Sequence, residues 1–282
     1  MVKLSSIGLL LLRSVLAGMT VLALLTAADA QSRVGVTAAT EGDPVARPPG
    51  QPDRVLVVGT DVQANEIITT ANNDRAHLIF LDGTTVTVGP NAQLTIDKFV
   101  YDPNTKKGEL AINASKGVFR LIGGKISKSA AITVTTPSST MGIRGGIMIF
   151  GVEPSQTTSV FVYGDSMTVT ANGQTQTVTT PGMQVNTSAG SAPGAPTVVV
   201  QGSLSAALGA LAGNTKAAAA LVAAINSVVA SNLSNAAVLA TLTALIQQVI
   251  IQNAPGTIGT GQTTTINFVI TENPNQSQGS PN

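Results

Sequence analysis

The sequence has little of what most catalytic and metal-binding proteins use. Its 282 residues include no Cys, no Trp and one histidine, and aromatic residues make up 3%. The lack of Cys excludes disulfides, thiolate metal sites and a cysteine nucleophile, and a single His77 argues against a tight zinc site. Charged residues amount to 10%, against the roughly 25% usual in globular domains. The polar surface must therefore come from Ser, Thr, Asn, Gln and Gly, as in many secreted β-rich proteins.

Charge gives no indication of a nucleic-acid partner. The formal net charge is +1, from 15 Lys and Arg and 14 Asp and Glu. Removing residues 1–30 takes away Lys3, Arg13 and Asp29, which leaves a neutral chain with 13 charges of each sign. No G-x-S-x-G nucleophile motif and no paired-acid constellation occurs, so the sequence predicts a non-enzyme with no cofactor and no metal.

The first thirty residues have the pattern of a signal peptide. Lys3 and Arg13 flank an apolar start, residues 14–25 (SVLAGMTVLALL) are apolar, and Ala28-Asp29-Ala30 places small residues at the cleavage positions. The alternative is an uncleaved membrane anchor, but the apolar run is shorter than the ~20 residues that a spanning helix needs. We therefore expect an exported chain that begins at Gln31 and has no spanning helix.

Composition changes divide the rest of the chain. Residues 31–53 contain DPVARPPGQPD and predict a disordered leader. Residues 54–187 hold many short alternating stretches between Gly, Pro, Asn and Asp, which predicts an all-β domain. Residues 188–202 predict a linker, residues 203–254 an Ala-rich helical region, and residues 255–282 a short strand and a disordered tail.

Two β-hairpins can be predicted in register. In RAHLIFLDGTTVTVG, a three-residue loop ending at Gly83 would place Leu78 opposite Val86 and Ala76 opposite Val88, with Gly83 in the left-handed conformation. In SMTVTANGQTQTV, a two-residue Asn-Gly turn at residues 172–173 would place Met167 opposite Val178.

The Ala-rich segment has no charged side chain between Lys216 and Glu272. Helices of this composition would associate if they were exposed. Their partners are therefore each other, the β-domain, a second copy of the chain or a membrane surface. We expect packing within the chain or a homo-oligomer formed through residues 203–252.

The middle of the sequence resembles a FecR domain, the extracytoplasmic module named after a regulator of ferric citrate transport. The resemblance covers residues 55–187 and rests on the DGTTVTVGPNA hairpin, GELAINASKGVFRLIGGK, TPSSTMGIRGG and TSVFVYGDSMTV, in the family's order. Gly146 stands where the family usually has Thr. The resemblance implies a mainly β fold, either a twisted β-solenoid or a sandwich-like domain, in the periplasm or at the cell surface of a Gram-negative bacterium.

The family-motif residues are candidates for structural roles. They are Asp82, Gly83, Pro137, Gly142, Arg144 and Gly145. Arg144 lies among glycines, where its rigid multi-donor fork is expected to reach a carboxylate or carbonyls and lock a chain crossing. The alternative interpretation is an exposed arginine that binds a ligand.

A local excess of positive charge offers a second candidate. Residues 98–128 include two acids, Asp102 and Glu109, and seven bases: Lys98, Lys106, Lys107, Lys116, Arg120, Lys125 and Lys128. Solvated strand positions are one interpretation, and a patch that binds an anionic envelope polymer is the other.

The sequence therefore predicts a non-catalytic exported envelope protein that binds or scaffolds a polymer or a protein partner. The alternatives are a sensing and signalling component that works with a membrane regulator and, more remotely, a polysaccharide-active enzyme.

Overall fold

The structure, a computed structural model, describes residues 33–199 and 201–212. This part of the chain is mainly β, as predicted. The predicted signal peptide, most of the Ala-rich region and the C-terminal strand and tail lie outside the described residues.

The seventeen strands of the described residues form one hydrogen-bonded network with two ladders that share β9. Ladder A contains β1 (Arg33–Glu41), β4 (Asp61–Gln63), β6 (Arg75–Phe80), β7 (Thr85–Val88), β12 (Ile147–Glu153), β13 (Gln156–Tyr163), β16 (Met183–Ser188) and β17 (Thr197–Val198). Ladder B contains β2 (Val45–Arg47), β3 (Arg54–Val55), β5 (Ile67–Thr69), β8 (Gln93–Asp102), β10 (Ile132–Thr135), β11 (Thr140–Arg144), β14 (Ser166–Ala171) and β15 (Gln174–Val178).

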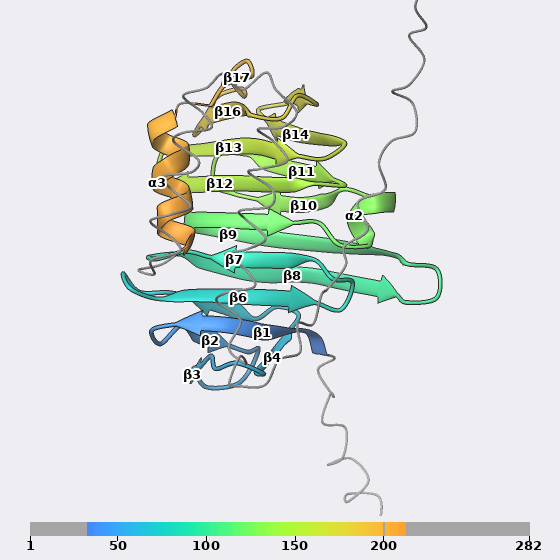
Figure 1. The fold of residues 1–282 in the computed structure, drawn as a ribbon, viewed down its shortest axis with the longest axis vertical. Helices are drawn as coiled ribbons and strands as arrows, with labels where there is room; N and C mark the ends of the chain where they lie inside the picture. The colour runs from blue at the N-terminus through green and yellow to red at the C-terminus, as the bar shows by residue number, and fades with distance from the viewer. Residues whose placement is uncertain (1–32, 200, 213–282) are drawn as a thin grey trace, which may run out of the picture.

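The two ladders run side by side along the long axis of the molecule (Figure 1). Their orders are β4-β1-β6-β7-β9-β12-β13-β16-β17 and β3-β2-β5-β8-β9-β10-β11-β14-β15. Nearly all neighbours are antiparallel, and β9 with β10 is a parallel pair. The short helix α2 (Ile126–Ser129) lies in the connection between these two strands.

The strand β9 (Lys107–Ile122) joins the ladders because it changes from one to the other at Gly117. Its first part pairs with β8 in ladder B, and residues from Gly117 onward pair with β7 and β12 in ladder A. Gly117 has φ 105°, and a Cβ there would lie 2.3 Å from the Cβ of Ala92. Glycine is therefore required where the long strand bends between the ladders.

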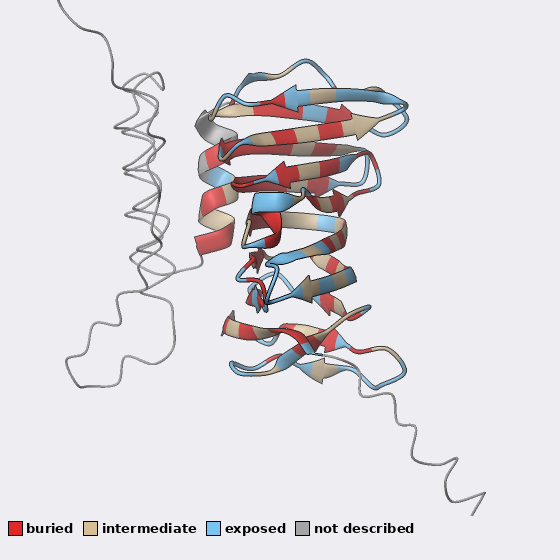
Figure 2. Ribbon diagram, turned by 90° about the vertical axis from the view of Figure 1, so that its right-hand side faces the viewer, coloured by how far each residue is buried: buried red, intermediate tan, exposed pale blue. Residues whose placement is uncertain are grey.

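The hydrophobic core lies between the ladders. Alternate residues of each strand point inward, so the core draws on both ladders, as in Leu94 and Ile112 of ladder B and Leu78 and Phe119 of ladder A. Phe119 stacks on Phe150 across β9 and β12, with ring centroids 5.0 Å apart. Figure 2 shows the alternation of buried and more exposed residues along the strands.

Both predicted hairpin registers are confirmed. Leu78 pairs with Val86 and Ala76 with Val88, and Gly83 has φ 85°. Met167 pairs with Val178.

The prediction of a disordered leader at residues 31–53 is wrong from Arg33 onward. Strand β1 pairs with β4 and β6, and β2 pairs with β3 and β5. Val34 and Ala46 are buried in the main core. These strands are stabilised by pairing with segments further along the chain, so their Pro-rich surroundings did not indicate them.

One helix covers the outer face of ladder A. Helix α3 (Gln201–Ala212) packs Leu204, Leu208 and Leu211 in a second apolar cluster with Ile149 and Val160 of the sheet. The predicted linker, residues 188–202, contains β17 and the beginning of this helix, and the Val199 amide donates to the Gly182 carbonyl at 2.9 Å. The segment is thus fastened to the end of ladder A.

Candidate functional site

The outer face of ladder B presents two rows of small, mostly polar side chains that cross its strands. We call it the threonine face. The first row crosses six strands and the second crosses five, and the strand pairings align them. The first consists of Thr95, Asn113, Thr135, Thr140, Thr170 and Thr175, and the second of Ala111, Thr133, Gly142, Thr168 and Thr177.

The spacing of these rows follows from sheet geometry. Neighbouring strands lie about 4.8 Å apart, so the six-residue row extends about 24 Å. Positions two residues apart on a strand, such as Thr133 and Thr135, lie about 6.7 Å apart. All residues of both rows are exposed or partly exposed, and none is charged. Each hydroxyl can both donate and accept a hydrogen bond, so the face is a periodic array of neutral hydrogen-bonding groups.

The threonines also stabilise the sheet that carries them. Thr is β-branched and suits a strand, and directly opposed Thr pairs contribute modestly to sheet stability. The hydroxyls of Thr170 and Thr175 lie 2.8 Å apart across β14 and β15. Such contacts fix the side chains in a regular arrangement.

Arg144 lies at the margin of this face. In β11, Met141 and Ile143 are buried, whereas Thr140, Gly142 and Arg144 point outward. Arg144 pairs in register with Ser166 and is exposed. The structure shows no ion pair or side-chain hydrogen bond from its guanidinium to any described residue, so the contact expected to lock a chain crossing is missing there. The side chain is an accessible cation beside the threonine rows.

Glycine backbone instead makes the crossing possible. The chain leaves ladder B after Arg144 and enters ladder A at β12. Gly145 has φ 60° and donates its amide to the Ser127 carbonyl at 2.9 Å. A Cβ on Gly146 would lie 1.9 Å from the Tyr163 carbonyl oxygen, and one on Gly164 would lie 2.5 Å from the Gly146 Cα. The residue after Arg144-Gly145 is therefore glycine because two backbones meet there.

Asp82 is buried, and its hydrogen bonds give it a structural role. Its carboxylate accepts the Thr84 amide at 2.9 Å, the Thr84 hydroxyl at 2.7 Å and the Ile126 amide at 3.1 Å. Its backbone carbonyl accepts the Lys125 amide at 2.9 Å. The Asp82-Gly83 turn is thus fixed to the beginning of α2.

Pro137 is exposed in the turn between β10 and β11, next to a buried cluster of hydroxyls. Thr136 and Ser138 both lie within hydrogen-bonding distance of the Thr157 hydroxyl, at 2.9 and 2.6 Å. The Thr136 amide donates to the Ser139 carbonyl at 2.8 Å. These contacts connect the end of ladder B to β13 in ladder A.

The predicted basic residues do not gather on one surface. Lys106 and Lys107 lie at the tip of the β8–β9 hairpin, whereas Lys116 is nine residues further along β9, about 30 Å away. Lys98 is paired with Glu109 at 2.6 Å. Lys125 and Lys128 are exposed beside and on α2.

Arg120 departs most from that prediction because it is only 3% exposed, on the outer face of ladder A. Its Nη2 donates to the Thr87 hydroxyl at 3.0 Å, and its Nε has no hydrogen-bond partner among the described residues. Burial lowers the pKa of Arg120 to about 10.

His77 lies in one row across ladder A with Thr87 and Arg120, since His77 pairs with Thr87 and Thr87 with Arg120. Its Nδ1 is 3.1 Å from the Thr87 hydroxyl. Burial, together with the charges of Arg120 and Arg75, lowers the pKa of His77 to about 4. Arg75 pairs with Glu41 at 2.7 Å and donates from Nε to the Ala210 carbonyl near the end of α3. A cation at this end of a helix is favourable, so Arg75 supports the attachment of α3.

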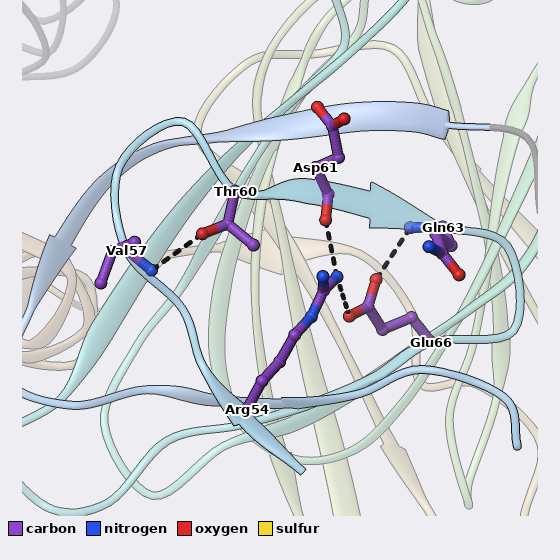
Figure 3. Close-up of polar contacts among 6 residues, drawn as sticks. All are labelled: Arg54, Val57, Thr60, Asp61, Gln63 and Glu66. Carbon is purple, nitrogen blue, oxygen red and sulfur yellow. Dashed lines mark hydrogen bonds and ion pairs between the residues drawn. The ribbon is translucent and has the colours of Figure 1, made fainter. Parts of the chain in front are cut away.

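A buried carboxylate at the N-terminal end of the stack is also structural. Glu66 is fully buried and accepts Arg54 Nη2 at 2.7 Å and the Gln63 amide at 2.8 Å. Arg54 Nη2 also donates to the Asp61 carbonyl at 2.7 Å. Figure 3 shows that Arg54 reaches across the turn toward these groups. Both carboxylate oxygens are used within the fold, so the pair fastens β3 to the turns around β4.

The described residues show neither a metal-binding cluster nor a membrane span. In residues 33–199 and 201–212 there is no group of three or more His, Asp or Glu side chains arranged to hold a metal ion. Over the same residues, no helix is both long and apolar enough to cross a membrane.

The threonine face was missed by sequence reasoning, although part of its signal is visible. The pattern Thr-x-Thr occurs at residues 133–135, 168–170 and 175–177. The same pattern at residues 85–87 lies on ladder A, so the pattern alone does not assign a face. The rows become visible only when the ladder order is known.

The middle of the chain matches a known family. Residues 66–166 match the family described as FecR protein, in line with the resemblance seen in the sequence. No curated protein matched the sequence.

Two crystal structures of a "putative anti-sigma factor" from Parabacteroides distasonis are distantly similar. The structure at 2.50 Å is 12% identical with a TM-score of 0.36, and the match covers 47% of this chain and 59% of the other. The structure at 1.65 Å is 11% identical with a TM-score of 0.39, and the match covers 51% and 65%. The chain therefore spans less than two thirds of either.

Proposed function

We propose that this chain is an exported, non-catalytic envelope protein whose threonine face binds an extended, polyhydroxylated polymer, a glycan of the cell envelope. The observation that carries the proposal is the pair of aligned rows on ladder B. Export rests on the signal-peptide pattern of residues 1–30. The fold class that we propose, a β-solenoid or sandwich-like domain, rests on the two ladders around one core.

The chemistry of the face suits this ligand. A glycan strand repeats its hydroxyls along its length, and an array of threonines repeats complementary donors and acceptors over about 24 Å. The rows contain no aromatic side chain, so affinity would come from many small hydrogen bonds and bridging waters. Arg144 supplies one accessible multi-donor cation for the occasional acidic group of such a polymer.

Salt distinguishes this proposal from binding through lysines. Neutral hydrogen bonds depend weakly on ionic strength, whereas contacts between exposed charges are screened beyond about 10 Å at 0.1 M salt. Binding through the threonine face is therefore expected to persist between low and physiological salt. Binding through Lys106, Lys107, Lys116 and Lys125 would be lost over the same range.

The test is co-sedimentation of the purified protein with isolated cell-wall sacculi across a salt series. The triple variant Thr135→Val, Thr168→Val, Thr170→Val removes three hydroxyls and keeps the side-chain shape. The matched control, Thr158→Val, lies on the outer face of ladder A, where Thr158 pairs with Gly151. We expect the triple variant to lose binding and the control to retain it.

Two results would contradict the proposal. One is unchanged binding by the triple variant, and the other is absence of binding by the wild-type protein at low salt. In either case the FecR match favours a second candidate function, sensing or relaying an envelope state to a membrane partner. That function is tested by crosslinking in cells followed by identification of a co-purified transmembrane regulator.

A further inference from the structure

The hairpin of β8 and β9 projects beyond its neighbours in ladder B. The two strands pair with each other from Gln93 to Asp102. However, β5 pairs with β8 only at residues 93–95, and β10 pairs with β9 only at residues 111–113. Residues 97–110 therefore form a two-stranded extension, which we call the arm (Figure 1).

The arm has a free backbone edge along β8. Among the described residues, positions 97–102 pair with β9 on one side and with no strand on the other. A strand edge with unpaired backbone groups is a template for another strand. Within the described part of the chain, no strand covers this edge.

The two faces of the arm differ. On the inner face Phe99 stacks on Phe80, with ring centroids 5.6 Å apart, and Tyr101 packs beside Phe99. On the outer face Val100 is 56% exposed between Lys98 and Asp102, which are also exposed. The outer face thus presents a cation, an apolar residue and an anion in order along the strand.

We propose that two copies of this chain pair antiparallel through the β8 edges of their arms, about a two-fold axis at Val100. In this register Lys98 of each copy lies opposite Asp102 of the other, Phe99 lies opposite Tyr101, and the two Val100 side chains meet. The sequence of the edge is therefore self-complementary in charge and in apolar character, as an isologous interface requires.

Other registers fit less well. A shift by one residue places outward residues opposite inward ones, which would turn the aromatic face of one copy to the outside. A shift by two residues separates Lys98 from Asp102. The Val100-centred register is the one that opposes the unlike charges and joins the apolar residues.

The dimer would have a consequence for binding. In an antiparallel pair, directly opposed residues lie on the same side of the sheet. The two-fold axis of the dimer is therefore perpendicular to the plane of the two-stranded sheet of the arm. Because the arm extends ladder B, the threonine faces of both copies would point to the same side. Two weak sites on one dimer raise the apparent affinity for a long polymer. The dimer itself does not depend on the proposed function.

The test is analytical ultracentrifugation of the purified protein over a range of concentrations at low salt. Lys98→Asp places a carboxylate opposite Asp102 of the other copy, and Asp102→Lys places an ammonium group opposite Lys98 of the other copy. Each variant converts two attractive pairs into two repulsive ones, so each is expected to weaken dimerisation roughly tenfold or more. Lys128→Asp on α2 is the matched charge reversal and is expected to change nothing.

Mixing the two variants is the decisive part of the experiment. In a heterodimer of Lys98→Asp with Asp102→Lys, one cross-copy pair joins the two wild-type residues and the other joins the two exchanged ones, so both pairs are again of opposite charge. We expect the mixture to dimerise as the wild-type protein does, although each variant alone does not.

Recovery on mixing also shows that both variants remain folded. This matters because Lys98 pairs with Glu109 within its own arm. Likewise, Asp102 accepts the Asn104 amide and the Thr105 hydroxyl at the tip of the arm. A variant that lost dimerisation because its arm had unfolded would not recover on mixing.

Three outcomes would overturn the inference: a wild-type protein that stays monomeric at millimolar concentration, variants that dimerise as well as the wild type, or a mixture that does not recover. Persistent dimers in the variants would place the interface elsewhere in the chain. Sacculus binding by a monomeric Lys98→Asp variant would leave the threonine face intact as a binding site, so the two proposals fail separately.

Discussion

The outer faces of the two ladders differ in composition and in exposure to solvent. On ladder A, outward residues such as Ile147, Ile149 and Val160 are apolar and buried, because α3 lies over them. On ladder B, the equivalent outward positions are threonines that remain open to solvent. A sheet face that must be covered is built from apolar residues, and a face built from hydroxyls needs no cover. Within residues 33–199 and 201–212 the threonine face is the uncovered one, and it is therefore the face that we propose for binding.

Three arginine side chains illustrate this division. Arg75 and Arg120 lie on ladder A and are buried. Arg144 lies on ladder B and is exposed. Arg75 thus contacts α3 and Arg120 contacts Thr87 within the sheet, whereas Arg144 points to solvent.

The largest contrast should appear when one face is truncated. Leu208 of α3 is 1% exposed. Leu208→Ala is expected to lower the free energy of unfolding by about 2–5 kcal/mol, because a buried leucine is lost and a cavity remains. Thr135→Val on the threonine face should change it by less than about 0.5 kcal/mol. Urea denaturation of both variants measures the difference, and equal effects would show that the two faces are not distinct in stability.

Acid should act on ladder A through His77. Its folded pKa is lowered to about 4, so as pH falls below about 6.5 the unfolded state takes up a proton first. The contribution of His77 to the free energy of unfolding is therefore fully present above pH 6.5. It is lost progressively down to about pH 4, by on the order of 1–3 kcal/mol. Urea denaturation at pH 7, 5.5 and 4.5 should show this slope, and His77→Gln should flatten it. A slope that is the same in the variant would assign the acid sensitivity to other groups.

Replacing Arg120 offers a smaller and opposite effect. Its buried guanidinium contacts the Thr87 hydroxyl, and its Nε lacks a hydrogen-bond partner in the part of the chain that the structure describes. A buried charge without full compensation costs stability, so Arg120→Met is expected to raise the free energy of unfolding by on the order of 1 kcal/mol. The measurement is the urea midpoint at pH 7. A large destabilisation would instead give Arg120 an essential role in attaching α3.

The smallest effect is expected within the threonine face. The Thr170 and Thr175 hydroxyls contact each other across β14 and β15. A double-mutant cycle with Thr170→Val and Thr175→Val should give a coupling energy of about 0.2–1 kcal/mol. Zero coupling would mean that the hydroxyls are held independently, and the regular array would then depend on the strands alone.

Local pattern predicted local structure well. The opposition of Leu78 to Val86 followed from which loop length keeps apolar residues on one side, and no distant contact was needed. Local pattern did not predict strand β1, because its stability comes from pairing with β4 and β6, which lie well beyond it in the sequence. Pairing partners that are distant in sequence cannot be read from alternation.

The candidate site was hidden for the same reason. Thr95 and Thr175 belong to one row, yet they are brought together only by the order of β8, β9, β10, β11, β14 and β15 in ladder B. The run of bases at residues 98–128 shows the converse, since neighbours in sequence lie at opposite ends of β9 and on different faces. Gly145 and Gly146 lie where the chain passes from ladder B to ladder A, whereas the arginine beside them points to solvent.

The most direct test of the account is a threonine-methyl NMR spectrum of the protein, titrated with soluble fragments of the envelope glycan. We expect shifts at Thr133, Thr135, Thr168 and Thr170 on ladder B, and unchanged signals from Thr85 and Thr158 on ladder A. Shifts confined to ladder A, or a spectrum that does not change at millimolar glycan, would contradict it.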